Sequence, residues 1–140
     1  MNEAQTVLPV VEALLRKAQA AQRRTSDLEQ ETQQIQQRIF LLGGVQIDIV
    51  AAARRRAERD KTTQEVQDTL AEIDAIGVQV KDLDIGLLDF PCAVDDEVVL
   101  LCWKYGEEKI EFWHGMEEGF KGRKPIDERI LRGKKREKPN

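Results

Sequence analysis

The chain has 140 residues, of which 34% are charged and 5% are aromatic, and its formal net charge is −4. This length fits a single domain, 1–140, and the low aromatic content favours a helix-rich fold, while the negative charge argues against nucleic acid as a partner. Two cysteines do not make a disulfide framework, and no apolar run approaches the roughly 20 residues of a membrane helix. We therefore expect a soluble, cytoplasmic protein that does not enter a membrane.

Hydrophobic periodicity predicts a long helical hairpin over residues 1–77. Apolar or small residues recur at alternating spacings of four and three, which indicates a coiled-coil-like seam. The seam consists of Val7, Val11, Leu14, Ala18, Ala21, Thr25, Leu28, Thr32, Ile35, Ile39 and Leu42. Gly43 and Gly44 predict the end of the first helix, and Gly77 predicts the end of a second helix that begins near residue 45. The short glycine connection favours an antiparallel pair.

The length of this hairpin bears on how the protein associates. At 1.5 Å per residue the first helix spans roughly 50–60 Å, which exceeds the width of a small domain. One partner helix covers only part of the seam on such a narrow arm, so we expect a second copy of the chain to cover the rest. The expected assembly is a homodimer, with an unknown protein partner as the alternative.

Residues 78–125 predict a small antiparallel sheet of three strands, which makes the fold class α+β. The first strand, 87–90, ends at Pro91; the second is EVVLLCW (97–103), and the third is KIEFWH (109–114). Turns are expected at 93–96 and 105–108. The remaining residues, 126–140, predict a short helical turn that docks through Ile126 and Ile130, followed by a disordered basic tail.

The turn positions predict the register of the sheet. They pair Phe90 with Val99, and Leu101 with Phe112. One face then forms the core, and it carries Leu88, Phe90, Val99, Leu101, Trp103, Ile110, Phe112 and His114. The other face carries Leu87, Asp89, Leu100, Cys102, Glu111 and Trp113.

Four residues in this region have the chemistry of a zinc site or of a thiol–histidine pair: Asp89, Cys92, Cys102 and His114. The predicted register places Asp89 and Cys102 on one face and His114 on the other. On that basis we expect no metal, no cofactor and no catalytic residue. A shift of one residue in either hairpin would reverse this conclusion.

A glycine-containing loop, HGMEEGFKGRKP, follows the third strand. Its backbone N–H groups and the fork of Arg123 can bind a carboxylate or a phosphate. The alternative, which we favour, is that Arg123 pairs with an acid of this chain, namely Asp82, Asp84 or Asp89.

Four segments of the chain resemble a bacterial family known as domain of unknown function 2203. They are NEAQTVLPVVEALL, VKDLDIGLLDFP, LLCWKYGE and FWHGMEEGFKGRKP. The resemblance implies a helical hairpin with a small sheet in a small soluble bacterial protein, and it implies no activity. It places motif positions at Asp82, Gly86, Asp89, Pro91, Trp103, Trp113, His114, Gly122, Arg123 and Pro125.

Three functional hypotheses remain. The first is a non-enzymatic, homodimeric interaction module that associates through the helical arm and the Trp113 face. The second is a small-anion site at the end of the sheet, with Asp82, Asp89, Trp113, His114, Gly122 and Arg123 as candidate ligand-binding residues. The third is a metal- or thiol-dependent enzyme that uses His114.

Overall fold

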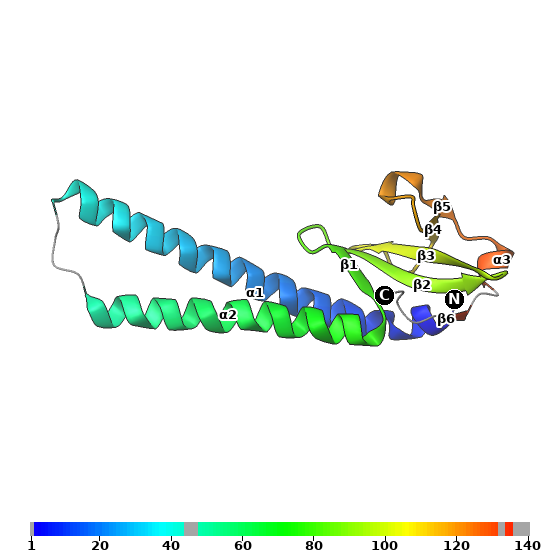
Figure 1. Ribbon diagram of the computed structural model, residues 1–140, viewed down its shortest axis with the longest axis horizontal. Helices are drawn as coiled ribbons and strands as arrows, with labels where there is room; N and C mark the ends of the chain where they lie inside the picture. The colour runs from blue at the N-terminus through cyan, green and yellow to red at the C-terminus, as the bar shows by residue number, and fades with distance from the viewer. Residues whose placement is uncertain (1, 44–47, 132–133, 136–140) are drawn as a thin grey trace. The chain divides into compact units, whose positions relative to one another are not determined.

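The structure is a computed structural model, and it describes residues 2–43, 48–131 and 134–135. Its elements are α1 (Asn2–Leu41), α2 (Ile49–Ile76), β1 (Gln79–Asp82), β2 (Leu87–Val94), β3 (Glu97–Lys104), β4 (Phe112–Gly115), the short 3₁₀ helix η1 (Phe120–Gly122), β5 (Lys124–Pro125), α3 (Glu128–Leu131) and β6 (Lys134–Lys135). The α+β class is confirmed (Figure 1). Within the described residues, no helix is both long and apolar enough to cross a bilayer.

The chain divides into two compact units that share both long helices. The sheet unit combines Met1–Arg16 with Leu70–Asn140, and the hairpin unit is Lys17–Thr69. The start of α1 and the end of α2 therefore belong with the strands.

Glycines end both long helices, as the sequence predicts. α1 ends at Leu41, and Gly43 follows with φ +72°. α2 ends at Ile76, where Gly77 has φ +99° and donates to the Asp74 carbonyl, while the Val78 N–H donates to the Ile73 carbonyl. These two bonds form a Schellman motif, which satisfies the last carbonyls of the helix. The predicted start of α2 near residue 45 lies outside the described residues.

Within the hairpin unit, α1 and α2 run antiparallel beside each other (Figure 1). Arg24 on α1 lies 2.7 Å from Glu58 on α2, and the Thr25 and Thr62 hydroxyls are 2.6 Å apart. Three seam residues of this unit, Ala18, Ala21 and Leu28, are buried within the single chain. These three seam residues are therefore covered by the chain itself, while a second chain over the rest of the seam stays a prediction.

The sheet has more strands than the three predicted. Five antiparallel strands follow the order β1-β2-β3-β4-β5, and β6 pairs with β2 beside them (Figure 1). β1, β5 and β6 are strands of four, two and two residues, which are too short to produce a clear period-two pattern. β6 also falls in the expected disordered tail, although residues 132–133 and 136–140 lie outside the described part of the chain.

The first hairpin is shifted by two residues from the predicted register. Phe90 pairs with Leu101 rather than Val99, and the turn is confined to Asp95 and Asp96. Both turn residues have positive φ, +47° and +65°, which is typical of a type I′ turn. Because strand side chains alternate with a period of two, this shift leaves every residue on its predicted face.

The second hairpin is shifted by one residue, and this shift exchanges the faces of β4. Leu101 pairs with Trp113 rather than Phe112, so Phe112 and His114 leave the predicted core face and Trp113 joins it. Glu107 gives the physical reason. Its carboxylate accepts the Lys104 N–H at 2.7 Å, so a side chain takes the place of the strand partner expected there.

The core of the sheet unit lies on the opposite face of the sheet from His114. It joins the first turns of α1 and the last turn of α2 to the strands, through residues that include Leu8, Val11, Leu15, Ile73, Val78, Leu88, Phe90, Val99, Leu101, Trp103 and Ile110. α3 adds Ile130, which is fully buried, and Ile126 packs against the same cluster. The predicted docking of this last helical turn is therefore confirmed.

Candidate functional site

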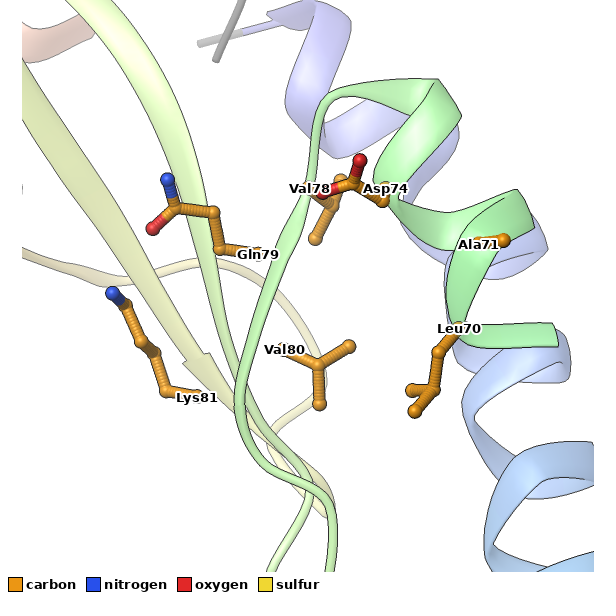
Figure 2. Close-up of a pocket in the computed structure, with 7 residues that line it drawn as sticks. All are labelled: Leu70, Ala71, Asp74, Val78, Gln79, Val80 and Lys81. Carbon is orange, nitrogen blue, oxygen red and sulfur yellow. The ribbon is translucent and has the colours of Figure 1, made fainter. Parts of the chain in front are cut away.

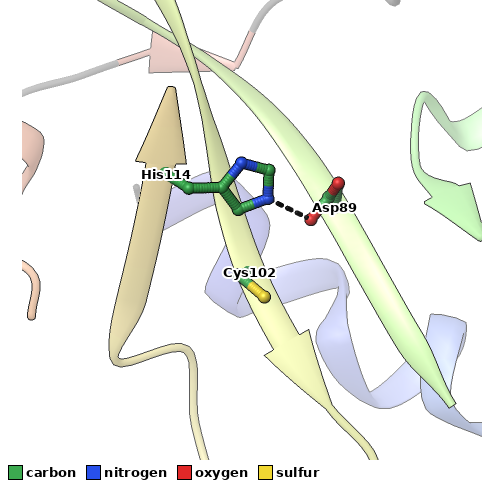
Figure 3. A group of neighbouring side chains, drawn as sticks. All are labelled: Asp89, Cys102 and His114. Atoms are coloured by element: carbon green, nitrogen blue, oxygen red, sulfur yellow. Dashed lines mark hydrogen bonds and ion pairs between the residues drawn. The ribbon is translucent and has the colours of Figure 1, made fainter. Parts of the chain in front are cut away.

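Three chemically active side chains converge on the face of the sheet that points away from the core. Asp89 comes from β2, Cys102 from β3 and His114 from β4 (Figure 3). Asp89 pairs directly with Cys102, and His114 pairs with Leu100 on the same strand as Cys102. The expectation that His114 lies on the other face is wrong, because it depended on the second-hairpin register.

The three side chains form a tight, buried cluster. One carboxylate oxygen, the thiol sulfur and one imidazole nitrogen all lie within 4.8 Å of one another. Their residues are almost completely inaccessible to solvent, and the His114 Nε2 lies 2.9 Å from the Asp89 Oδ1. Buried polar groups at this density require partners of opposite charge or hydrogen-bonding role.

The two hydrogen-bond contacts of His114 restrict where its protons lie. Nδ1 is 2.8 Å from the Gly115 carbonyl oxygen, which only accepts, so Nδ1 carries a hydrogen and donates it. In a neutral ring Nε2 then presents a lone pair to the Asp89 carboxylate. Two acceptors that face each other at 2.9 Å require a cation between them, either a proton or a metal ion.

Cys102 is a buried thiol with one nearby cation. Burial raises its pKa, and the Arg123 guanidinium, whose Nη1 lies 3.9 Å from Sγ, opposes part of that rise. Without a bound metal, the sulfur is therefore a neutral thiol at neutral pH. A bound metal ion displaces that proton directly, because thiolate is the form that coordinates.

Arg123 is held by groups of its own chain. Its Nη1 and Nη2 donate to the two carboxylate oxygens of Glu107 at 3.2 and 2.9 Å, and its guanidinium stacks on Phe112 and Phe120 at 3.9 and 4.3 Å from the ring centres. Burial alone lowers its pKa, but the Glu107 carboxylate outweighs this effect and the pKa is raised. The internal partner is thus Glu107 rather than Asp82, Asp84 or Asp89.

The other candidate ligand-binding residues lie apart from this cluster. The Asp82 carboxylate accepts the N–H groups of Asp84 and Ile85 and so closes the β1–β2 turn. Trp113 packs toward the core, and its Nε1 is buried without a hydrogen-bond partner among the described residues. A Cβ on Gly122 would come 2.8 Å from Glu118 Oε2, so glycine permits a close approach there.

The cluster has the donor set of a transition-metal site. Carboxylate oxygen, thiolate sulfur and imidazole nitrogen all coordinate zinc, with bonds of about 2.0–2.3 Å. Tetrahedral geometry with such bonds separates ligand atoms by about 3.4–3.6 Å. To bind zinc, the His114 Nε2 and the Asp89 Oδ1 would move apart from 2.9 Å. Any ligand atoms that lie farther apart, up to the limit of 4.8 Å, would move closer together. The Nδ1–H bond to the Gly115 carbonyl resembles the outer bond that orients metal-bound histidines.

The same geometry does not favour a thiol nucleophile. Such an enzyme needs one imidazole nitrogen on the thiol and the other on an orienting group. Both nitrogens of His114 are already engaged, by Asp89 and by the Gly115 carbonyl. The raised pKa of the buried Cys102 thiol also works against thiolate formation without a metal.

A pocket of about 220 Å³ opens beside the cluster, and Asp89 and His114 form part of its wall. A second hollow, of about 570 Å³, lies beside Trp113, Lys124 and Arg129. A third, of about 530 Å³, lies between the end of α2 and β1. Figure 2 shows Val80 facing Leu70 across this third hollow, with Gln79 and Lys81 on the other side of the strand. Of the three hollows, the first adjoins the titratable cluster.

Cys102 and Glu107 are the residues that sequence reasoning left out of the candidate site. The sequence marks Cys102 as a possible metal ligand, but the predicted register places it on the opposite face from His114. Glu107 gave one usable signal, since an acid placed three residues after a strand end can fold back to accept the N–H there. That signal would have argued for a longer loop and for the observed β3–β4 pairing.

A family described as "Uncharacterized conserved protein (DUF2203)" matches residues 1–126. No curated protein and no solved structure matches the chain.

Proposed function

The chain belongs to the DUF2203 family of uncharacterised conserved proteins, and from this premise, which assigns no activity, we propose that it is a metal-binding protein. Asp89, Cys102 and His114 hold one divalent transition-metal ion on the outer face of the sheet. The observation that carries this proposal is the burial of a carboxylate oxygen, a thiol sulfur and an imidazole nitrogen within 4.8 Å of one another. A metal ion satisfies all three groups at once.

The donor set selects the class of metal. Thiolate is a soft ligand that Mg²⁺ and Ca²⁺ avoid, whereas Zn²⁺ and its neighbours accept sulfur, nitrogen and oxygen together. A divalent ion with one carboxylate and one thiolate forms a neutral unit, which suits burial. The free thiols of Cys92 and Cys102 also fit a reducing compartment such as the cytoplasm.

Three protein ligands leave one position of a tetrahedral ion open. Zinc sites that act on a bound molecule have this arrangement, whereas structural zinc sites use four protein ligands. The pocket beside Asp89 and His114 is where a fourth ligand would enter. The proposed ion is therefore a reactive or ligand-binding centre rather than a structural one.

Metal titration of the chelator-treated protein tests this proposal. We expect one Co²⁺ or Zn²⁺ per chain, with sulfur-to-cobalt charge-transfer absorption in the cobalt form. Cys102→Ala should lower the affinity by more than about 100-fold, because loss of even an outer hydrogen-bond partner costs about 10–100-fold. Cys92→Ala is the matched control, since Cys92 is equally buried but lies on the core face.

Two results would contradict the proposal. One is the absence of a stoichiometric ion in the wild-type protein. The other is a Cys102→Ala variant that binds cobalt as tightly as the wild type does.

A second candidate function, a homodimeric interaction module, is favoured by one specific observation. Large apolar side chains at the tip of the hairpin unit are exposed: Phe40, Leu41, Leu42, Ile49 and Val50. Several exposed large apolar side chains at one end of a helical pair are typical of an interface. This function is compatible with a metal centre in the sheet unit. Measuring the oligomeric state of the protein tests whether the module forms a homodimer.

A further inference from the structure

We propose that the pocket beside Asp89 and His114 binds a small carboxylate with a short apolar tail. This inference rests on the proposed metal centre, because the carboxylate takes the open position of the ion. Carboxylate oxygens are established ligands of zinc-class metals. The size of the pocket, its apolar wall and its charge favour a small carboxylate over other metal ligands.

The size of the pocket excludes a large ligand. Its volume is about 220 Å³, which is below the roughly 300–1,000 Å³ of sites that bind drug-sized molecules. Four of its wall residues present apolar atoms: Leu87, Leu100, Met116 and Phe120. A short hydrocarbon tail packs against them, whereas a strongly hydrated molecule such as a sugar leaves its hydroxyl groups without partners.

The charges around the pocket favour an anion. Lys81 lines it and forms no ion pair with any residue that the structure describes. The other charged wall residue outside the cluster, Glu118, is already engaged by the Lys124 ammonium and the Gly115 N–H. Once Asp89 and the Cys102 thiolate have neutralised the metal ion, the uncompensated charge at the pocket belongs to Lys81.

The position of Lys81 follows from the sheet. Gln79 of β1 pairs with Asp89 of β2, so these two residues share a face. Gln79 and Lys81 lie on the same side of β1, opposite Val80 (Figure 2). The ammonium group of Lys81 is therefore on the metal-binding side of the sheet.

The test uses the cobalt-loaded protein, because the visible spectrum of Co²⁺ changes when its fourth ligand changes. Acetate, butyrate and butylamine are titrated separately into the same sample. We expect acetate and butyrate to change the spectrum, butyrate with about fourfold higher affinity per added methylene, and butylamine to have no effect. Lys81→Met should weaken butyrate about two- to fivefold, whereas the control Lys109→Met, at an exposed turn lysine, should not.

The outcomes separate this inference from the proposed function. A protein that binds no cobalt contradicts the metal centre itself. A protein that binds cobalt but shows no spectral change with carboxylates overturns the present inference alone. Equal affinities for acetate and butyrate, or equal binding of butylamine, also overturn it. Lys81 is exposed, so its variant should fold, and circular dichroism checks this.

Discussion

At the residue scale, the buried thiol of Cys92 gives the protein a pH-dependent stability. Cys92 lies in the core on β2, and burial raises its pKa. In the unfolded chain a cysteine titrates near about 8.5. Below that pH the thiol is neutral in both states and its stabilising contribution is complete. Above it the unfolded chain loses a proton that the folded chain keeps, so the free energy of unfolding falls as the pH rises.

Thermal unfolding of the metal-free protein measures this effect. The stability advantage of the wild type over Cys92→Ala should shrink as the pH is raised from neutral to about 10, above the unfolded thiol pKa. Val94→Ala removes a non-titrating buried side chain from the same strand, so its penalty should stay constant with pH. A Cys92→Ala penalty that is equally constant would show that the thiol does not titrate differently on folding.

Individual residues of the site could be predicted from the sequence, but the contacts between their side chains could not. Asp89, His114 and Arg123 were singled out by residue type, and all three lie in or beside the buried cluster. The partner of Arg123 was missed because several acids were equally plausible by sequence distance. Glu107 is selected by a loop conformation that residue types alone do not specify.

At the scale of elements, the β2–β3 turn contains strain that a substitution can relieve. Asp95 and Asp96 both adopt positive φ, a conformation that costs most side chains roughly 1–2 kcal/mol but costs glycine little. Asp96→Gly should therefore raise the free energy of unfolding by about 0.5–1 kcal/mol, net of the greater entropy of glycine in the unfolded chain.

Chemical denaturation of the single variants measures this difference. Asp96→Val serves as the opposite case, because a β-branched side chain tolerates positive φ poorly and should destabilise the protein. A stabilising valine together with a destabilising glycine would contradict the type I′ turn.

The register of the two hairpins shows why the site was not predicted while the core largely was. The first shift, of two residues, preserved the alternation that places Leu88, Phe90, Leu101 and Trp103 in the core. The second shift, of one residue, exchanged the faces of Trp113 and His114. The alternation of apolar residues does not resolve this case, because β4 has an aromatic ring on each face. The deciding interaction is the Glu107 side chain on the Lys104 N–H.

At the scale of the whole molecule, helix ends and the α+β class were predictable because glycines and heptad spacing are local signals. The homodimer stays a prediction, which was made from the heptad seam together with the length of the first helix. Val11, Ala18, Ala21 and Leu28 of the seam are buried within one chain. Large apolar side chains are strongly exposed at the tip of the hairpin unit, where Phe40 is 83% and Ile49 is 77% exposed.

We propose that a second copy of the chain covers this tip, because the charges beside it would pair in a two-fold arrangement. Arg38 and Asp48 flank the apolar residues with opposite charges, so a two-fold arrangement brings the Arg38 of one protomer near the Asp48 of its partner.

Burying each large apolar side chain contributes about 1.5–3 kcal/mol. Leu42→Ser with Ile49→Ser removes four such side chains from a dimer and should weaken association at least about a thousandfold. Analytical ultracentrifugation measures the result, with Val10→Ser as the control, since Val10 is an exposed apolar residue outside the hairpin unit. A wild-type protein that sediments as a monomer at every concentration, or a Val10→Ser variant that dissociates as readily as the tip variant, would contradict association through the tip.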